Sequence, residues 1–207
     1  MGAGDPAASR EAAVPAEPVR RLRRPERREQ ILAAATRAFA RAGFAGAGFA
    51  ATSLDDVAAE AGITRVILYR HFESKDDMYR AVLDRACTRL AEAVGTDDFT
   101  EDAIPALVRA AAADPGAFRL LFRHAAREPE FRDLADSLTA ASAEVAQRNL
   151  AGQISGGPWL DWAARLIPVV TTEAVIAWLD AGQPDSGEAA GRIAGAVHGV
   201  IQAAQPR

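Results

Sequence analysis

The stretch from Ser53 to Phe72, SLDDVAAEAGITRVILYRHF, decides the fold. Ser53 can cap the helix that follows it, and Asp56 stands where it completes a capping box. Gly62 suits a tight turn because glycine tolerates a positive φ. Thr64 can then cap a second short helix. Two short helices joined by so short a turn must cross steeply, so the spacing predicts a helix-turn-helix.

The apolar residues of this stretch fall at positions that can share one core. They are Val57, Ala58, Ala61, Ile63, Leu68 and Phe72. The other face of the second helix then carries Thr64, Arg65, Val66 and Tyr69. Exposed on a short helix of this motif, these four side chains are free to meet the edges of base pairs in a DNA groove.

Helical periodicity continues on both sides of the motif, and strand-like alternation is missing. A helix over about 26–42 stops at Gly43, and a loop rich in glycine and alanine follows to Ala51. Ser74, with Asp77 three residues later, is expected to cap a long helix that ends near residue 94. Further helices are predicted over about 100–113, from Pro115, over 129–151, over 158–179 and over 186–203.

The predicted fold class is therefore all-α, with about nine helices. A disordered arm over 1–24 is expected to precede a three-helix helix-turn-helix domain over 25–80. Residues 81–207 then form a larger helical domain. We expect this second domain to bind a ligand and to dimerise.

The charge of the chain is divided between these parts. Its net charge is −4, but residues 20–80 hold 12 basic and 8 acidic side chains, while 81–207 hold 11 and 17. A basic module joined to an acidic one is expected when only one part meets phosphates. Arg23 and Arg24 close a basic run that can lie along phosphates or enter a minor groove. A solvated charge run remains the alternative reading.

The N-terminal domain resembles the TetR (tetracycline repressor-like) family of bacterial transcriptional regulators. The resemblance rests on 28–35 (REQILAAA), Gly43-Phe44, 52–58 (TSLDDVA), 61–65 (AGITR), 68–72 (LYRHF) and Ser74-Lys75. It implies that 64–70 is the recognition helix and that Tyr69, His71 and Lys75 touch phosphates. It also implies a homodimer on a palindromic operator, most often acting as a repressor, with an inducer pocket in the larger domain.

Two features depart from the family pattern. The loop over 45–51 carries extra residues, and Val66 and Ile67 replace small and polar residues of the recognition helix. The predicted DNA-binding residues are Arg23, Arg24, Thr52, Ser53, Thr64, Arg65, Val66, Tyr69, Arg70, His71 and Lys75.

Aromatic residues gather in the second half of the chain. A ligand pocket is predicted from Phe118, Phe122, His124, Trp159, Trp162 and Trp178. Few charged residues lie among them, which favours an apolar or aromatic effector. Ordinary core packing is the alternative for each of these side chains, and a satisfied or solvent-facing histidine is the alternative for His124.

The last predicted helix carries Gly191, Gly195 and Gly199 on one face. Glycine is a poor helix former, so three on one face indicate close approach of another helix. Together with Val200 and the helix over 159–179, they predict a four-helix dimer interface between two copies of the chain.

Several other function classes are disfavoured. One cysteine, Cys87, leaves no internal disulfide and no cysteine-based metal cage. No metal-ligand spacing and no catalytic arrangement is visible, so we expect no cofactor, no metal and no enzyme activity. No membrane-spanning run or secretory signal is visible either, which favours a cytoplasmic address. An all-helical enzyme or carrier, or a module for an acidic protein partner, remain the alternatives to a DNA-binding regulator.

Overall fold

The computed structural model describes residues 22–44, 48–95 and 102–206, and these contain helices and no strand. The helices are α1 (Arg24–Phe44), α2 (Gly48–Ala51), α3 (Leu54–Ala61), α4 (Arg65–Tyr69), α5 (Lys75–Val94), α6 (Ala103–Ala113), α7 (Pro115–Arg119), α8 (Arg132–Leu150), α9 (Pro158–Asp180) and α10 (Ser186–Ala204). A π-helical turn (Leu120–His124) and two 3-10 turns (Ala125–Arg127, Pro129–Phe131) connect α7 to α8. The all-α prediction is confirmed, with ten α-helices in the described residues rather than nine.

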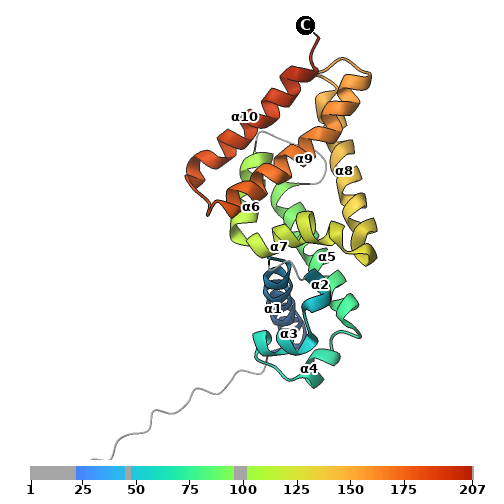
Figure 1. Ribbon diagram of the computed structural model, residues 1–207, viewed down its shortest axis with the longest axis vertical. Helices are drawn as coiled ribbons and strands as arrows, with labels where there is room; N and C mark the ends of the chain where they lie inside the picture. Colours follow the sequence, from blue (N-terminus) through green and yellow to red (C-terminus); the bar gives the residue numbers. More distant parts are fainter. Residues whose placement is uncertain (1–21, 45–47, 96–101, 207) are drawn as a thin grey trace, which may run out of the picture.

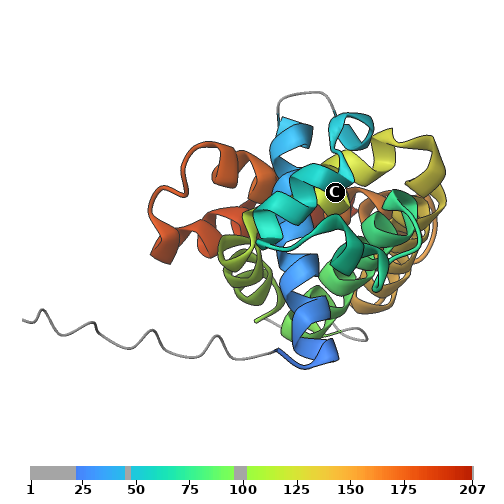
Figure 2. The same ribbon diagram turned by 90° about the horizontal axis from the view of Figure 1, so that it is seen from below.

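The molecule is elongated, with α1, α3 and α4 at one end and α8, α9 and α10 at the other (Figure 1). Seen from below, α1 runs through the middle of the molecule, between α10 on one side and α8 on the other (Figure 2). The long helix α5 leads from the lower end toward the upper one. It crosses residue 80, where the sequence placed the boundary between the two domains.

The helix-turn-helix forms for the reasons that the sequence predicts. The Ser53 hydroxyl accepts a hydrogen bond from the Asp56 N–H at 3.1 Å, and the Asp56 carboxylate accepts one from the Ser53 N–H at 2.9 Å. Gly62 ends α3 with a φ of 64°. Ser74 caps α5 by accepting a hydrogen bond from the Asp77 N–H. Thr64 differs, because its backbone is extended but its side chain makes no capping hydrogen bond.

One continuous core joins the lower helices to the middle of the molecule. Its fully buried members include Ile31, Phe39, Val57, Leu68, Phe72, Tyr79, Leu120 and Phe131. Residues of α1, α3, α4 and α5 therefore share this core with the turns that follow α7. A second core joins α6, α9 and α10 around Ile176 and Ile193, and a third joins α8, α9 and the end of α10 around Leu160 and Ala204.

The loop predicted over 45–51 contains helix α2 instead, in its described part. The Phe49 ring lies 5.0 Å from the Tyr79 ring and 5.3 Å from the Phe131 ring, between centroids. Glu128 accepts a hydrogen bond from the Phe49 N–H at 2.8 Å, at the start of α2. The Lys75 ammonium donates to the carbonyls of Phe49 and Ala50 at 3.1 and 3.2 Å, at its end. This short helix is therefore held at both ends.

Helix α9 is the most apolar long helix in the described chain. By length and composition alone it could cross a membrane, with a mean hydropathy of 1.3 over an 18-residue window. In the structure 44% of that window is buried, against α6, α8 and α10. The helix continues through Pro168. Its hydropathy is that of a core helix in a bundle.

Candidate DNA-binding surface and ligand cavity

Helix α4 lies at the lower tip of the molecule (Figure 1), and the face that the sequence assigned to DNA is exposed there. Val66 is 64% exposed and Tyr69 is 47% exposed. Leu68, in contrast, is fully buried and fixes the helix to the core. The exposed row on α4, which consists of Val66 and Tyr69 with Arg65 beside them, therefore offers both apolar surface and polar groups to a DNA groove.

Arg65 is held in position before any DNA is present. Its guanidinium donates hydrogen bonds to the Asp55 carboxylate at 3.0 Å and to the Tyr69 hydroxyl at 3.2 Å. It also lies 5.5 Å from the centroid of the Tyr69 ring. These contacts, chiefly the Tyr69 hydrogen bond, raise the pKa of Arg65 further above its usual range. A guanidinium ordered in this way can donate two hydrogen bonds to a guanine edge.

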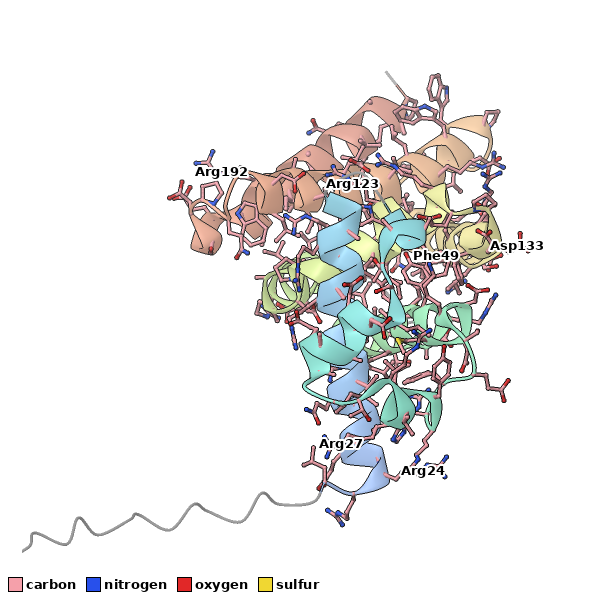
Figure 3. The ribbon with its side chains drawn as sticks, turned by 60° about the horizontal axis from the view of Figure 1, so that its bottom comes forward. Arg24, Arg27, Phe49, Arg123, Asp133 and Arg192 are labelled. Carbon is pink, nitrogen blue, oxygen red and sulfur yellow. The ribbon has the colours of Figure 1, made fainter. Side chains whose placement is uncertain are left out.

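Basic side chains surround this tip. Arg23 and Arg24 are exposed at the start of α1, and Arg70 is exposed directly after α4. Arg24 and Arg27 lie at the lower end of α1, on the same end of the molecule as α4 (Figure 3). Arg23 also forms an ion pair with Glu26 at 3.2 Å. The remainder of the predicted basic run, Arg20 and Arg21, lies outside the described residues.

His71 lies half-buried beside the same arginines. Burial lowers its pKa, and the charges of Arg24, Arg28 and Arg27 lower it further. The neutral imidazole is therefore favoured at neutral pH, so His71 can offer a phosphate an N–H donor but not a full positive charge.

Two predicted DNA-binding residues are placed differently from the expectation. Thr52 is only 4% exposed, and its hydroxyl is buried without a hydrogen-bond partner, so it does not reach the surface of the described chain. The Lys75 ammonium is directed at the end of α2 and lies 4.2 Å from the centroid of the Phe49 ring. No pattern in the sequence indicated α2, and therefore none indicated this second role of Lys75. Ser53 and Thr64 are exposed, as predicted.

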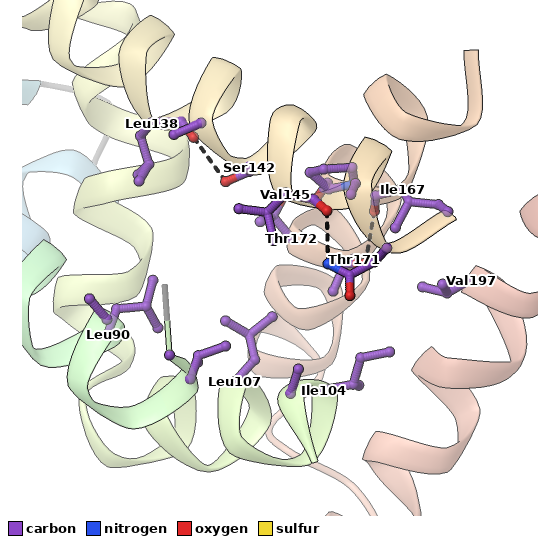
Figure 4. Close-up of a pocket in the computed structure, with 18 of the residues that line it drawn as sticks. Leu90, Ile104, Leu107, Leu138, Ser142, Val145, Ile167, Thr171, Thr172 and Val197 are labelled. Carbon is purple, nitrogen blue, oxygen red and sulfur yellow. Dashed lines mark hydrogen bonds between the residues drawn. The ribbon is translucent and has the colours of Figure 1, made fainter. Parts of the chain in front are cut away.

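A cavity of about 410 Å³ lies among α5, α6, α8, α9 and α10. Aliphatic side chains make up most of its wall and reach into it from several helices (Figure 4). They include Leu90, Ile104, Leu107, Leu138, Val145 and Ile167. The volume is within the range of small-molecule sites.

Only one of the six predicted pocket residues, Phe122, lines this cavity. Phe118 and Trp178 are buried in the second core instead, where the Trp178 indole donates to the Pro184 carbonyl at 2.8 Å. Trp159 and Trp162 are exposed on α9, at 60% and 39%. Residue type could not show which of these side chains meets the cavity. A helix with apolar residues on every side gives no indication of which side faces a core and which faces a cavity. The aliphatic residues that do line the cavity cannot be told from ordinary core residues in the sequence.

His124 lies outside the cavity, at the junction of α1 with the π-helical turn. It is 7% exposed, and its Nε2 is buried without a hydrogen-bond partner. Its ring lies so close to Gly43 that a Cβ there would be 2.9 Å from three ring atoms. Burial lowers the pKa of His124, and the charges of Arg127, Arg123 and Arg119 add to this, while Glu128 opposes it.

The outer face of α9 and α10 is open. Trp159 and Trp162 contact each other edge to face, with centroids 5.7 Å apart, and Val169 is 47% exposed on the same helix. On α10, a Cβ added at Gly191, Gly195 or Gly199 would meet nothing within 4 Å. Among residues 22–44, 48–95 and 102–206, then, no other helix approaches the glycine row. Val200 departs from the prediction, because it packs inward against the third core.

No group of three or more His, Cys, Asp or Glu side chains that could hold a metal ion occurs in the described part of the chain.

Comparison with known proteins agrees with this arrangement. Residues 31–82 match the model of a family described as bacterial regulatory proteins, tetR family. The chain is 42% identical over 74 residues to the HTH-type transcriptional activator FasR of Mycolicibacterium smegmatis, and 41% identical over 70 residues to an HTH-type transcriptional repressor of Mycobacterium tuberculosis. These matches cover 36% and 34% of this chain, and 32% and 37% of the relatives.

The structural similarity covers more of the chain than the sequence similarity does. A TetR-like transcriptional regulator from Rhodococcus sp. RHA1 superposes with a TM-score of 0.70 at 23% identity, over 84% of this chain and 94% of that one. NalD of Pseudomonas aeruginosa gives a TM-score of 0.63 at 18% identity, over 84% and 96%. The N-terminal match and the shared fold lead to the same assignment. The chain carries the N-terminal domain of the TetR family of bacterial regulatory proteins, on a fold that it shares with TetR-like regulators.

Proposed function

We propose that this protein is a cytoplasmic, ligand-responsive transcriptional repressor that binds a palindromic operator as a homodimer. The observation that carries the proposal is the exposed row on α4, where Val66 and Tyr69 face outward beside the ordered guanidinium of Arg65. None of the residues that the structure describes covers this row. A DNA groove would satisfy both its apolar and its polar groups.

Affinity and specificity would come from different residues. Arg23, Arg24 and Arg70 surround the tip and can neutralise phosphates, which contributes affinity for any duplex. Arg65 can read a base edge, which contributes discrimination worth ~1–3 kcal/mol. Selection of bound sequences from random duplexes is the direct test. We expect enrichment of a short palindrome, whereas binding that selects no sequence would contradict the proposal.

The homodimer is proposed to form through α9 and α10. Trp159, Trp162 and Val169 provide exposed apolar surface on α9, and the glycine row on α10 would let a partner helix approach closely. Light scattering at micromolar concentration should give the mass of two chains. Gly195→Glu should give a monomer that binds the operator poorly, and a wild-type monomer would rule out this arrangement.

The ligand would act through α5. Met78, Tyr79 and Val82 of this helix lie in the core shared with the DNA-binding end, and Leu90 and Val94 line the cavity. Occupation of the cavity can shift the balance between two settings of α5 and so change the distance between the paired recognition helices. Successive major grooves require ~34–36 Å between them. A ligand moves this balance only by its difference in affinity for the two settings.

The relatives named above include both an activator and a repressor, so they do not decide the direction of regulation. Repression is proposed because it is the commoner activity in the family. A reporter gene placed behind the selected operator gives the test. Expression should fall when the protein is supplied, and a rise would show an activator.

A further inference from the structure

We infer that the cavity takes a neutral, mainly aliphatic ligand that carries a hydrogen-bond donor, such as a hydroxyl, and that it does not take a buried carboxylate. This inference rests on the proposed ligand-responsive function. It comes from the side chains that line the cavity and from the hydrogen bonds that they already make.

The first observation is the absence of charge. None of the described residues that line the cavity is Lys, Arg, His, Asp or Glu. An ionised carboxylate transferred into such a site would lose its hydration without gaining a partner, which is costly.

The second observation is the state of the polar side chains in the wall. Three hydroxyls line it, and each donates its hydrogen to a carbonyl of its own helix. Ser142 donates to Leu138 at 2.8 Å, Thr171 to Ile167 at 2.7 Å, and Thr172 to Pro168 at 2.9 Å. A hydroxyl has one donor and two acceptor lone pairs, so these groups have only acceptor capacity left.

The amide of Asn149 adds to this pattern. Its Nδ2 donates to the Val145 carbonyl at 2.8 Å, which leaves its Oδ1 as an acceptor and one N–H of the amide. The exposed side chain of Gln153, which also lines the cavity, offers both an acceptor and N–H donors. The polar side chains of the wall that are buried or half-buried are therefore the ones weighted toward acceptors, and Figure 4 shows the hydrogen bonds that occupy the donors of Ser142 and Thr171. A ligand that donates one hydrogen bond fits this wall, and one that can only accept leaves it largely unsatisfied.

The third observation is size and shape. A volume of about 410 Å³ lies within the range of pockets that hold small organic molecules. Aromatic rings are nearly absent from the wall, where Phe122 is the one aromatic side chain among the described lining residues. Aliphatic side chains without stacking partners favour an alkyl or alicyclic body over a flat aromatic one.

The test compares three probes of similar length by calorimetry on the protein without DNA. The probes are 1-decanol, its isomer 1-methoxynonane, which has no donor, and decanoate at pH 7.5. We expect decanol to bind at least tenfold more tightly than decanoate. Decanoate binding as tightly as decanol, or binding of none of the three up to saturation, overturns the inference.

Single variants then test the acceptors. We expect at least one of Ser142→Ala, Thr171→Val and Thr172→Val to weaken decanol binding about fivefold, the factor of one neutral hydrogen bond. The same variant should leave the binding of 1-methoxynonane within about twofold. Melting temperatures confirm that each variant is folded. If all three variants bind decanol like the wild type, the hydroxyls do not receive the ligand and the inference fails.

Cys87 supplies an independent reading of occupancy, because it is the single cysteine of the chain and lines the cavity. Its alkylation by N-ethylmaleimide should slow when decanol is present, and should not slow with decanoate. Neither the calorimetry nor the alkylation of Cys87 involves DNA. A protein that binds decanol but selects no operator would refute the proposed function alone, and one that selects an operator but prefers decanoate would refute only the ligand class.

Discussion

The carboxylate of Glu128 accepts a hydrogen bond from the backbone N–H of Phe49, across 79 positions of sequence. Glu128 lies between the two 3-10 turns that precede α8, and Phe49 belongs to the short helix α2. Through this bond and the Phe49 ring, α2 joins the DNA-binding end to the larger helical part. The lack of a side chain at Gly48 permits this contact, because a Cβ there would lie 2.5 Å from the Glu128 carboxylate.

We predict that Glu128→Ala lowers the free energy of unfolding by about 1–3 kcal/mol, because it leaves the Phe49 N–H without its charged acceptor. Urea unfolding gives the measurement. Glu128→Gln keeps an acceptor oxygen and should recover part of the loss. Glu130→Ala removes an exposed carboxylate two residues away and should cost little. Equal losses for the variants at 128 and 130 would show that the bond does not hold α2.

Gly43→Ala should destabilise the protein by roughly 1–3 kcal/mol, although alanine is the better helix former. The added methyl would lie 2.9 Å from the His124 ring, which is buried and cannot move aside easily. In a His124→Ala background the same substitution should cost much less, which a double-mutant cycle measures. Additive losses would mean that the two residues do not interact.

Arg65→Ala and Arg70→Ala should weaken DNA binding in different ways. Loss of Arg65 should reduce the preference for the selected operator over random duplex by ~1–3 kcal/mol. Loss of Arg70 should weaken both duplexes alike and lower the slope of log affinity against log salt by about 0.9. Gel-shift titrations at several salt concentrations separate the two. Identical behaviour would contradict the division of roles.

Stability should fall as the pH drops below about 6.5. The folded state lowers the pKa of His124 and of His71, so the unfolded chain takes up protons first as the pH falls. The stability that these two histidines contribute is fully present above the pKa of histidine in the unfolded chain. It is lost as the pH falls below that pKa. Unfolding free energies between pH 8 and pH 5 give the slope, and His124→Gln and His71→Gln should each reduce it. Carboxylates such as Glu29, whose pKa is also lowered, contribute only at more acidic pH.

The local elements of the fold were predictable because their causes are local. The capping box of Ser53 and Asp56, the turn at Gly62 and the start of α7 at Asp114 and Pro115 all depend on residues within a few positions. The outward face of α4 followed from the same reasoning, because a short helix with Leu68 buried must expose its other side.

The contacts that were missed join distant segments. Helix α2 forms because Glu128 and Lys75 satisfy its two ends, and neither is near it in sequence. Most of the side chains that were predicted to form a pocket lie elsewhere, because residues of one helix can face different surroundings, as Trp159 and Trp178 of α9 do. Aromatic residues attract attention in a sequence, whereas the leucines and alanines that enclose a space resemble those of any core.

Helix α10 is weak when considered by itself. Each glycine in its open row costs about 1 kcal/mol relative to alanine, so the three together forgo roughly 3 kcal/mol of helix stability. We therefore expect its last turns to fray in dilute solution and to be protected from hydrogen exchange once a second copy shields them. The cellular abundance of the protein would then set how much of this helix is formed.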